Sequence, residues 1–439
     1  MKYNWAQLKP QIRQVWRLSL PAILTQLTTI VMQYIDSAMV GALGANASAA
    51  IGLVASTTWL FGGVTSAVSA GFSVQVAHHV GAERLDMARN VVRHGLVSAL
   101  VASGLLALVG AIISGPLPAW LGGETEIQSN ASAYFLVFAM VLPFSQMNSL
   151  CSGFLQCAGD MMTPSVLNAS MCGLDVMFNA IFIPRYGVLG AAIGTGLACL
   201  VVSLIMLWRC CLCNSRLKLH RAEKSKFTPE IIKKAFQIGT PTALQEIAMC
   251  GAMVATTRII APLGSVAIAA NSFAITAESL CYMPAYGIGA ATTALVGRTI
   301  GAGDYRLAKQ LGNLCTALGG AFMGITALIM AVFCPFVFMF MTPDPSVRQL
   351  AAAVLRIGLV AEPLFGVSIV AASALRGAGD TLVPSLMNIL SIWIVRIGLA
   401  LLLVGSLGLQ SAWIAMAVEL CVRGALMLYR QKTSKHYSR

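Results

Sequence analysis

Long apolar segments alternate with short polar connections along the entire chain. A transmembrane helix needs about 20 apolar residues to cross the hydrocarbon core of a bilayer, and most charged residues fall between segments of that length. The pattern therefore predicts an all-α polytopic membrane protein. Its twelve expected transmembrane helices cover residues 15–42, 50–78, 92–114, 131–156, 163–184, 188–210, 236–262, 267–298, 311–334, 351–375, 383–404 and 408–430.

The composition of the 439-residue chain supports a membrane protein over a soluble one. Hydrophobic residues make up 57% of the chain, charged residues make up 10%, and the mean hydropathy is +0.79, whereas soluble proteins carry about 25% charged residues. The net charge of +13 does not indicate a nucleic-acid partner, because such a partner requires basic residues gathered on one soluble face. We expect the lipid bilayer as a partner and no nucleic acid.

The positions of the basic residues predict how the chain is oriented. Most of the 29 Lys and Arg residues fall in the amino-terminal segment, the tail and alternate connections between the expected helices. Basic loops are retained on the cytoplasmic side of a membrane. The opposite connections carry little positive charge, and residues 115–130 contain only the acids Glu124 and Glu126 as charged groups. Both termini are therefore expected in the cytoplasm.

An internal repeat with a constant offset of 220 residues divides the chain. The repeat predicts an N-lobe at residues 1–213, a basic cytoplasmic linker at 214–234 and a C-lobe at 235–439. Each lobe holds six expected helices, an even number, so the lobes enter the membrane in the same sense and are related by a pseudo-twofold axis along the membrane normal. The matching positions include Pro21 and Pro241, Gly81 and Gly301, Pro143 and Pro363, Asp160 and Asp380, and Asn168 and Asn388.

Two six-helix lobes around such an axis favour a transporter. Rocking one lobe against the other exposes a central site to each side of the membrane in turn, which is alternating access. Duplicated helical bundles also occur in channels and in membrane enzymes, so the repeat alone leaves these classes open. An enzyme would need a nucleophile and a positioned base, and no His lies in the middle of an expected helix. We therefore expect no enzyme, and no cofactor or resident metal beyond a coupling ion.

Six acidic residues fall inside expected transmembrane helices, where a charge costs about 2.5–3.5 kcal/mol on insertion scales. Acids in such positions are paired or functional. None of the six repeats at the 220-residue offset, so the two lobes share a scaffold and differ in chemistry. The six residues are Asp36, Asp175, Glu246, Glu278, Glu362 and Glu419.

The second half offers basic partners for its acids. Glu419 and Arg423 are four residues apart, which is the spacing of a salt bridge within a helix, and Arg258 and Arg396 are further bases within the expected helices. We expect these four residues to form structural ion pairs. For Glu246, Glu278 and Glu362, ion pairing and a role in coupling or substrate contact both stay open.

The first half has no Lys or Arg in the middle of a helix, so Asp36 and Asp175 lack an evident counter-charge. Each must bind a proton, a metal cation such as sodium, or a cationic substrate; a permanently protonated Asp36 in a polar helix contact is the alternative. Asn179 follows Asp175 by one turn, and Pro21 permits Asp36's helix to bend. Further members of an N-lobe polar pocket are expected to be Gln33, Asn148 and Thr195.

Several motifs together resemble the multidrug and toxic compound extrusion (MATE) transporters over essentially the whole chain. They are Pro21 and Asp36 in the first helix, the runs 261–265 and 278–284, Leu295-Val296-Gly297 followed by Gly301-Ala302-Gly303, the run 374–380, and Trp393 to Arg396.

This resemblance implies an inner-membrane antiporter that exports organic, often cationic, compounds in exchange for protons or sodium. It also implies that Asp36 is a coupling carboxylate that works with polar groups on the fifth helix. Relatives often carry Asn-x3-Asp on that helix, whereas this chain has Asp175-x3-Asn179. The sodium-coupled branch has a Glu where this chain has Met249. We expect a monomer.

A lipid-linked glycan flippase, from the same wider superfamily, is the nearest alternative. Such a flippase should have Arg and Lys around its cavity to bind pyrophosphate. The acids without bases in the first half do not fit that requirement.

Overall fold

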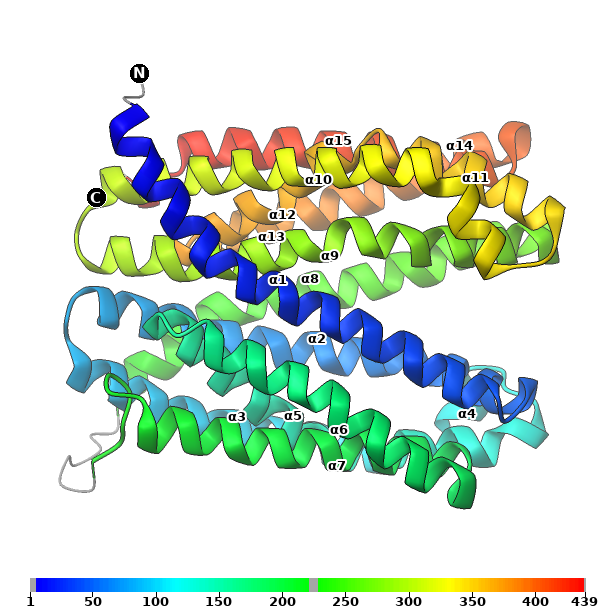
Figure 1. Cartoon of the computed structure of the whole chain (residues 1–439), viewed down its shortest axis with the longest axis horizontal. Coiled ribbons are helices and arrows are strands. Elements are labelled where there is room, and N and C mark those ends of the chain that lie inside the picture. Colours follow the sequence, from blue (N-terminus) through cyan, green and yellow to red (C-terminus); the bar gives the residue numbers. More distant parts are fainter. Residues whose placement is uncertain (1–4, 221–227, 438–439) are drawn as a thin grey trace. The chain divides into compact units, whose positions relative to one another are not determined.

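The computed structural model describes residues 5–220 and 228–437, which form helices and connecting turns (Figure 1). Residues 221–227, within the predicted linker, lie outside the described residues. The helices of the first half are α1 (Trp5–Gly41), α2 (Ala45–Gly81), α3 (Leu85–Ile113), α4 (Leu117–Trp120), α5 (Thr125–Ala158), α6 (Met162–Tyr186), α7 (Val188–Trp208) and the π-helical η1 (Arg209–Cys213).

The second half repeats this order with additional breaks, and its first helix begins inside the predicted linker. Its elements are α8 (Pro229–Ile260), η2 (Ala261–Leu263), α9 (Ser265–Gly301), α10 (Tyr305–Met341), α11 (Pro345–Leu359), α12 (Glu362–Gly377), α13 (Leu382–Leu390), the π-helical η3 (Ser391–Ile397), α14 (Gly398–Leu407), α15 (Leu409–Thr433) and η4 (Lys435–Tyr437).

In the described part of the chain, eleven helical segments are long and apolar enough to cross a membrane. The pair α11 and α12 makes a twelfth when it is counted as one span, with a bend of 54° at its break. The expected all-α polytopic fold with twelve spans is thereby confirmed, and the protein is a multi-pass membrane protein. The tenth span is not the single helix 351–375 that the apolar pattern predicts, because it breaks between Leu359 and Glu362.

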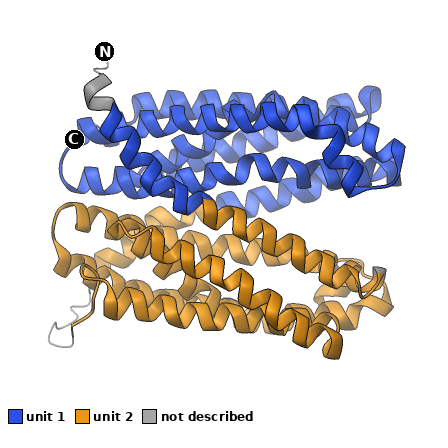
Figure 2. Cartoon of the chain, viewed as in Figure 1, with its two compact units in different colours: residues 1–23, 244–439 blue, residues 24–243 orange. Residues whose placement is uncertain are grey.

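The structure divides into two compact units, and the division falls inside helices (Figure 2). Unit 1 contains residues 1–23 and 244–439, and unit 2 contains residues 24–243. Unit 2 thus holds most of the predicted N-lobe and unit 1 most of the predicted C-lobe, but the beginnings of α1 and α8 are exchanged. Pro21 and Pro241 lie close to the two points of exchange.

Close backbone packing holds each exchanged segment in its unit. In unit 1, a Cβ on Gly287 of α9 would lie 2.6 Å from the backbone nitrogen of Ile23 in α1. In unit 2, a Cβ on Gly71 of α2 would lie 2.5 Å from the carbonyl oxygen of Ala235 in α8, and the Gln75 side chain donates to the carbonyl of Ile231 at 3.1 Å. Only glycine permits helices to approach this closely, because it has no Cβ.

Each unit has its own apolar core. In unit 2, Phe61 of α2 packs edge to face against Phe135 of α5, with ring centroids 5.8 Å apart. In unit 1, Trp413 of α15 is buried among residues of α9, α10 and α11, and its indole nitrogen donates to Asn271 at 3.0 Å. Many other large apolar side chains are exposed on the surfaces of the helices, as expected for a surface that lipid covers.

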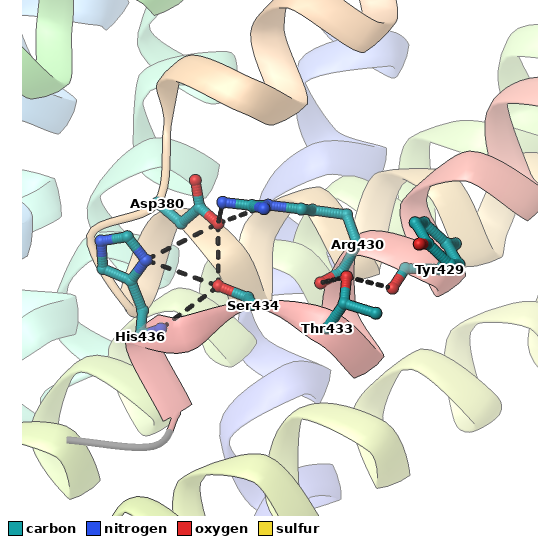
Figure 3. A network of polar contacts seen from close by, with 6 residues as sticks. All are labelled: Asp380, Tyr429, Arg430, Thr433, Ser434 and His436. Atoms are coloured by element: carbon teal, nitrogen blue, oxygen red, sulfur yellow. Dashed lines mark hydrogen bonds and ion pairs between the residues drawn. The ribbon is translucent and has the colours of Figure 1, made fainter.

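A repeated Gly-Asp turn anchors a different segment in each unit. In unit 2, Asp160 accepts hydrogen bonds from the Thr163 backbone at 3.0 Å and hydroxyl at 2.6 Å. In unit 1, the matching Asp380 instead holds the carboxyl-terminal segment (Figure 3). Arg430 forms an ion pair with Asp380 at 2.7 Å, and Ser434 donates to the same carboxylate at 2.8 Å. The same turn therefore makes a local contact in unit 2 and a tertiary contact in unit 1.

Candidate cation-binding site

Two helices of unit 2 bring the first-half acids together. Asp36 lies on the part of α1 that belongs to unit 2, and Asp175 lies on α6. Asn179 follows Asp175 by four residues, so both side chains project from the same face of α6. Asp175 and Asn179 are completely buried, and Asp36 is half-buried.

The Asn179 amide connects the two acids. Its nitrogen donates to Oδ1 of Asp36 at 2.8 Å and to Oδ2 of Asp175 at 3.2 Å, and the two carboxyl groups lie beside each other. An amide nitrogen has two hydrogens, so one group serves both carboxylates. The structure brings together the three residues for which the sequence predicts a coupling role; that role stays a prediction.

The cluster has spare acceptor capacity and no basic partner. Oδ1 of Asp175 and Oδ1 of Asn179 are buried without a hydrogen bond, and neither acid forms an ion pair with any residue that the structure describes. Two like charges close together in a low-dielectric interior oppose simultaneous ionisation. The cluster can bind a proton at a carboxylate, or can offer a set of oxygen ligands to a small hard cation.

Two neighbours of this cluster are absent from the sequence-based expectations. Tyr134 of α5 lies close enough to interact electrostatically with both Asp36 and Asp175. Gly194 of α7 faces Asn179, because a Cβ there would lie 3.0 Å from the Asn179 backbone nitrogen and would collide with its Oδ1. Tyr134 is a polar residue in an apolar span, and the residue that matches it in the second half is Val354. Comparison of the two halves could therefore have indicated Tyr134 from the sequence.

The structure does not gather the rest of the predicted polar pocket around Asp36. Asn148 donates instead to Asn168 at 3.2 Å, eleven residues before Asn179, which is about 16 Å along a helix. Gln33 is exposed, although it lies one turn from Asp36. Thr195 is half-buried beside Gly194, so it is the pocket residue that lies nearest to the cluster in sequence.

Of the four residues expected in structural ion pairs, Glu419 and Arg423 form one, and Arg396 and Arg258 form none among the described residues. Nε of Arg423 lies 3.0 Å from Oε1 of buried Glu419, and Ser391 donates to the same oxygen at 2.9 Å. Arg396, on η3, interacts electrostatically with Glu419 but forms no ion pair among the described residues. Arg258 is exposed in the last turn of α8 without an ionic partner in the described chain, where a basic side chain reaches the membrane surface and favours the helix terminus.

The remaining acids of unit 1 occupy two places. Glu246 of α8 is half-buried and has Arg376 as its electrostatic partner. Glu278 of α9 and Glu362 of α12 are buried and interact with each other. Met249 contributes to an apolar cluster with Ala252 and Ile392.

Comparison with known proteins places the chain among membrane transporters. The MatE family model matches residues 21–181 and 241–402. The chain belongs to the MatE family. The two matched segments begin at the repeated Pro21 and Pro241, and the family assignment confirms the resemblance that the sequence motifs carry.

Members of the MatE family from several bacteria are similar over nearly their whole length. A probable multidrug resistance protein NorM from Thermotoga maritima is 26% identical and covers 95% of this chain and 92% of its own. The multidrug resistance protein NorM from Burkholderia vietnamiensis is 27% identical, and the match covers 94% of this chain and 92% of that protein. A crystal structure of the Vibrio cholerae MATE transporter VcmN has a TM-score of 0.92 at 19% identity and covers 98% of this chain and 99% of that one, which shows a shared fold.

Proposed function

We propose that this MatE protein is a multidrug efflux antiporter of the cell inner membrane, a monomer with both termini in the cytoplasm. It exports organic, often cationic, compounds by alternating access in exchange for protons or sodium. Family membership and the names of its relatives support multidrug efflux. The observation that carries the coupling mechanism is the cluster of Asp36, Asn179 and Asp175, in which Asn179 and Asp175 are buried and the acids have no basic ion-pair partner among the described residues.

The cluster suits ion exchange because its charge changes when it binds a cation. With both carboxylates ionised, the repulsion between them favours an arrangement of α1 and α6 that admits an external proton or sodium ion. Binding of that ion removes the repulsion and strengthens the contacts across Asn179. A bound ion shifts the balance between two conformations only through its different affinity for them, so the site must hold its ion more tightly in one state than in the other.

The test is transport of ethidium, a fluorescent organic cation, by purified protein in liposomes. A pH gradient without sodium and a sodium gradient without a pH gradient are applied separately. We expect one gradient to drive ethidium movement in the parent protein, and Asp36→Asn to reduce it to the rate of empty liposomes. The Asn side chain keeps an oxygen that accepts from Asn179 and removes only the charge. The matched control is Glu126→Gln, which removes an exposed acid of α5.

The outcomes separate the alternatives. Transport by Asp36→Asn with unchanged dependence on either gradient would overturn the coupling role. A response to sodium alone identifies sodium as the coupling ion and leaves the site in place. If neither protein transports ethidium under either gradient and the parent protein moves a fluorescent lipid-linked glycan, the flippase alternative replaces efflux. The acidic character of the cluster argues against that alternative.

A further inference from the structure

A second group of buried acids lies in unit 1, on different helices from the first. Glu278 is in the middle of α9 and 5% exposed, and Glu362 occupies the first turn of α12 and is 0% exposed. Their side chains meet. Oε1 of Glu278 and both carboxyl oxygens of Glu362 are buried and accept no hydrogen bond from the described residues.

Three buried acceptors without donors cannot be explained as ordinary ionised carboxylates. Burial of an unpaired charge costs several kcal/mol of folding free energy. Two adjacent carboxylates in a low-dielectric interior do not both ionise. One proton held between the two groups removes one charge and supplies the missing donor. It would form an O–H···O hydrogen bond from one glutamate to the other and would thereby connect α9 to α12.

The positive charges on the surrounding helices are too few to compensate all the nearby carboxylates, which favours binding of one proton. Arg423 of α15 is held by Glu419 at 3.0 Å, and Arg396 of η3 is shared electrostatically between Glu419 and Glu278. We call Glu278, Glu362, Glu419, Arg396 and Arg423 the charged layer of unit 1. It contains three carboxyl groups and two guanidinium groups, so one bound proton makes its net charge zero. The other titratable or charged side chains on these helices and on those packed against them are Cys281, Tyr282, Tyr286 and Arg298 of α9, Tyr305, Arg306, Lys309, Cys315 and Cys334 of α10, Arg348 and Arg356 of α11, Arg376 of α12, and Cys421, Tyr429, Arg430 and Lys432 of α15.

The backbone around this pair departs from regular α-helix. Glu362 directly follows the 54° bend between α11 and α12. Arg396 lies in the π-helical η3, and Pro284 lies six residues after Glu278 within α9. Bends and π-helical segments are places where helix packing can change, and they occur often at functional sites. Gain or loss of a proton between α9 and α12 would act on a helix that already begins at a bend.

We infer that Glu278 and Glu362 form a second proton-exchange site, in unit 1, which holds one shared proton and releases it to water during each transport cycle. Release breaks the hydrogen bond between the two glutamates and leaves two carboxylates, of which Glu278 interacts electrostatically with Arg396. Rebinding restores the bond. The inference rests on the proposed function as a transporter but does not require the Asp36 cluster, which lies in the other unit.

The direct test follows the carboxyl groups by infrared difference spectroscopy of protein in lipid, as the pH is changed. Protonated carboxyl groups have a carbonyl stretching band that carboxylates lack. In a background of Asp36→Asn with Asp175→Asn, we expect such a band to appear and disappear reversibly with pH. Glu362→Gln should remove that band, and Glu278→Gln should remove or shift it. Glu246→Gln, which alters a half-buried acid on α8, should leave it unchanged.

Transport provides the second measurement. If both sites exchange protons, ethidium efflux by the parent protein should depend on the pH gradient with the steepness of two protons, and Glu362→Gln should reduce that steepness to one. Glutamine can still donate to Glu278, so thermal unfolding should show that this variant is folded. A carbonyl band that never changes with pH would mean a permanent structural proton. Absence of the band would mean that the pair is ionised, and either result would overturn the inference.

These results are independent of the fate of the proposed coupling role of Asp36. If Asp36→Asn transports normally while the band assigned to Glu362 still responds to pH, the first site fails and the second one stands. If Asp36→Asn loses transport and the band is absent, the opposite holds.

Discussion

The two halves of the chain build the same succession of helices and place charge in them differently. In unit 2, Asp36 and Asp175 lie on uninterrupted helices and share the Asn179 amide without a basic partner. The matching positions in the second half are Thr256, Val395 and Leu399. In unit 1, Glu278 and Glu419 also lie on uninterrupted helices, but Glu362 follows the break between α11 and α12, and arginines lie among the acids. The duplicated backbone thus tolerates a cluster of ionisable groups on different helices in its two copies.

The difference shows what each arrangement requires of the backbone. A carboxyl pair joined by an amide needs only two facing helices, and α1 and α6 remain regular. The unit 1 layer must accommodate the large guanidinium groups of Arg396 and Arg423 inside a helical bundle. Arg423 lies over the ring of Phe365 at 5.2 Å from its centroid, and Arg396 lies in η3, where α6 of the other half is regular. The bend before Glu362 and the π-helical segment at Arg396 therefore lie at charged residues that the first half lacks, whereas Arg423 lies in the continuous helix α15.

The largest expected effect comes from separating the buried ion pair of unit 1. Arg423→Met removes the ion-pair partner of buried Glu419, and we expect it to lower the free energy of unfolding by about 3–5 kcal/mol. The measurement is unfolding of the purified protein in detergent, followed by tryptophan fluorescence. The matched variant is Glu419→Leu with Arg423→Met, which removes both charges as the first half does with Cys199 and Ser203.

Because replacement of both partners by apolar residues is often close to neutral, the double variant should be markedly more stable than Arg423→Met alone. If the single and double variants lose the same free energy of unfolding, Glu419 and Arg423 do not stabilise each other as an ion pair. The proposed difference in charge between the two halves would then have no effect on stability at this pair. Transport would still be expected to change in both variants, since Arg423 belongs to the charged layer around Glu278.

A glycine permits a test of the unit 2 cluster that changes no charge. In Gly194→Ala, the new Cβ collides with the Asn179 amide oxygen, and overpacking of this kind costs about 1–3 kcal/mol. Displacement of Asn179 separates the donor from both carboxylates. We expect ethidium exchange to slow by about tenfold or more, since about 1.4 kcal/mol corresponds to tenfold in rate.

The matched control for that variant is Gly173→Ala on α6, two residues before Asp175, where a Cβ meets nothing within 4 Å. It should transport at the parent rate. Equal transport by both alanine variants would mean that the position of Asn179 does not matter to the cluster. The infrared band of the Glu278 and Glu362 pair should be unaffected by either variant, because both glycines lie in unit 2.

The sequence predicts the helices and the first acid cluster because each follows from a local signal. Apolar length determines the spans, the 220-residue offset reveals the repeat, and an acid in a span without a base indicates Asp36 and Asp175. Spacing along α6 places Asn179 beside Asp175, and the Glu419 and Arg423 pair follows from the same helical period. In each case the relevant neighbours are within one turn, or the signal is the absence of any partner.

The features that could not be predicted depend on which helix faces which. The contact of Glu278 with Glu362 joins residues of different helices, and neither apolar periodicity nor composition specifies it. The same holds for Asn148, which is directed to Asn168 by the packing of α5 against α6. The break before Glu362 is a further case, because the repeated Pro143 lies within a continuous α5. A proline therefore permits a break, and the surrounding packing decides whether it occurs.

The smallest expected effect concerns a turn that the two halves build with different residues. Glu83, between α2 and α3, has a φ of 57°, and its counterpart Gly303 has a φ of 83°. The left-handed conformation costs a residue with a Cβ about 1–2 kcal/mol, so Glu83→Gly should raise the free energy of unfolding by about 1 kcal/mol, and Gly303→Ala should lower it by a similar amount. The next residue differs as well: Asp304 accepts from the Leu307 backbone at 2.8 Å, whereas Arg84 provides no such cap. If Gly303→Ala destabilises and Glu83→Gly has no effect, a contact of the Glu83 side chain offsets its strain, and the two turns differ in more than their sequence.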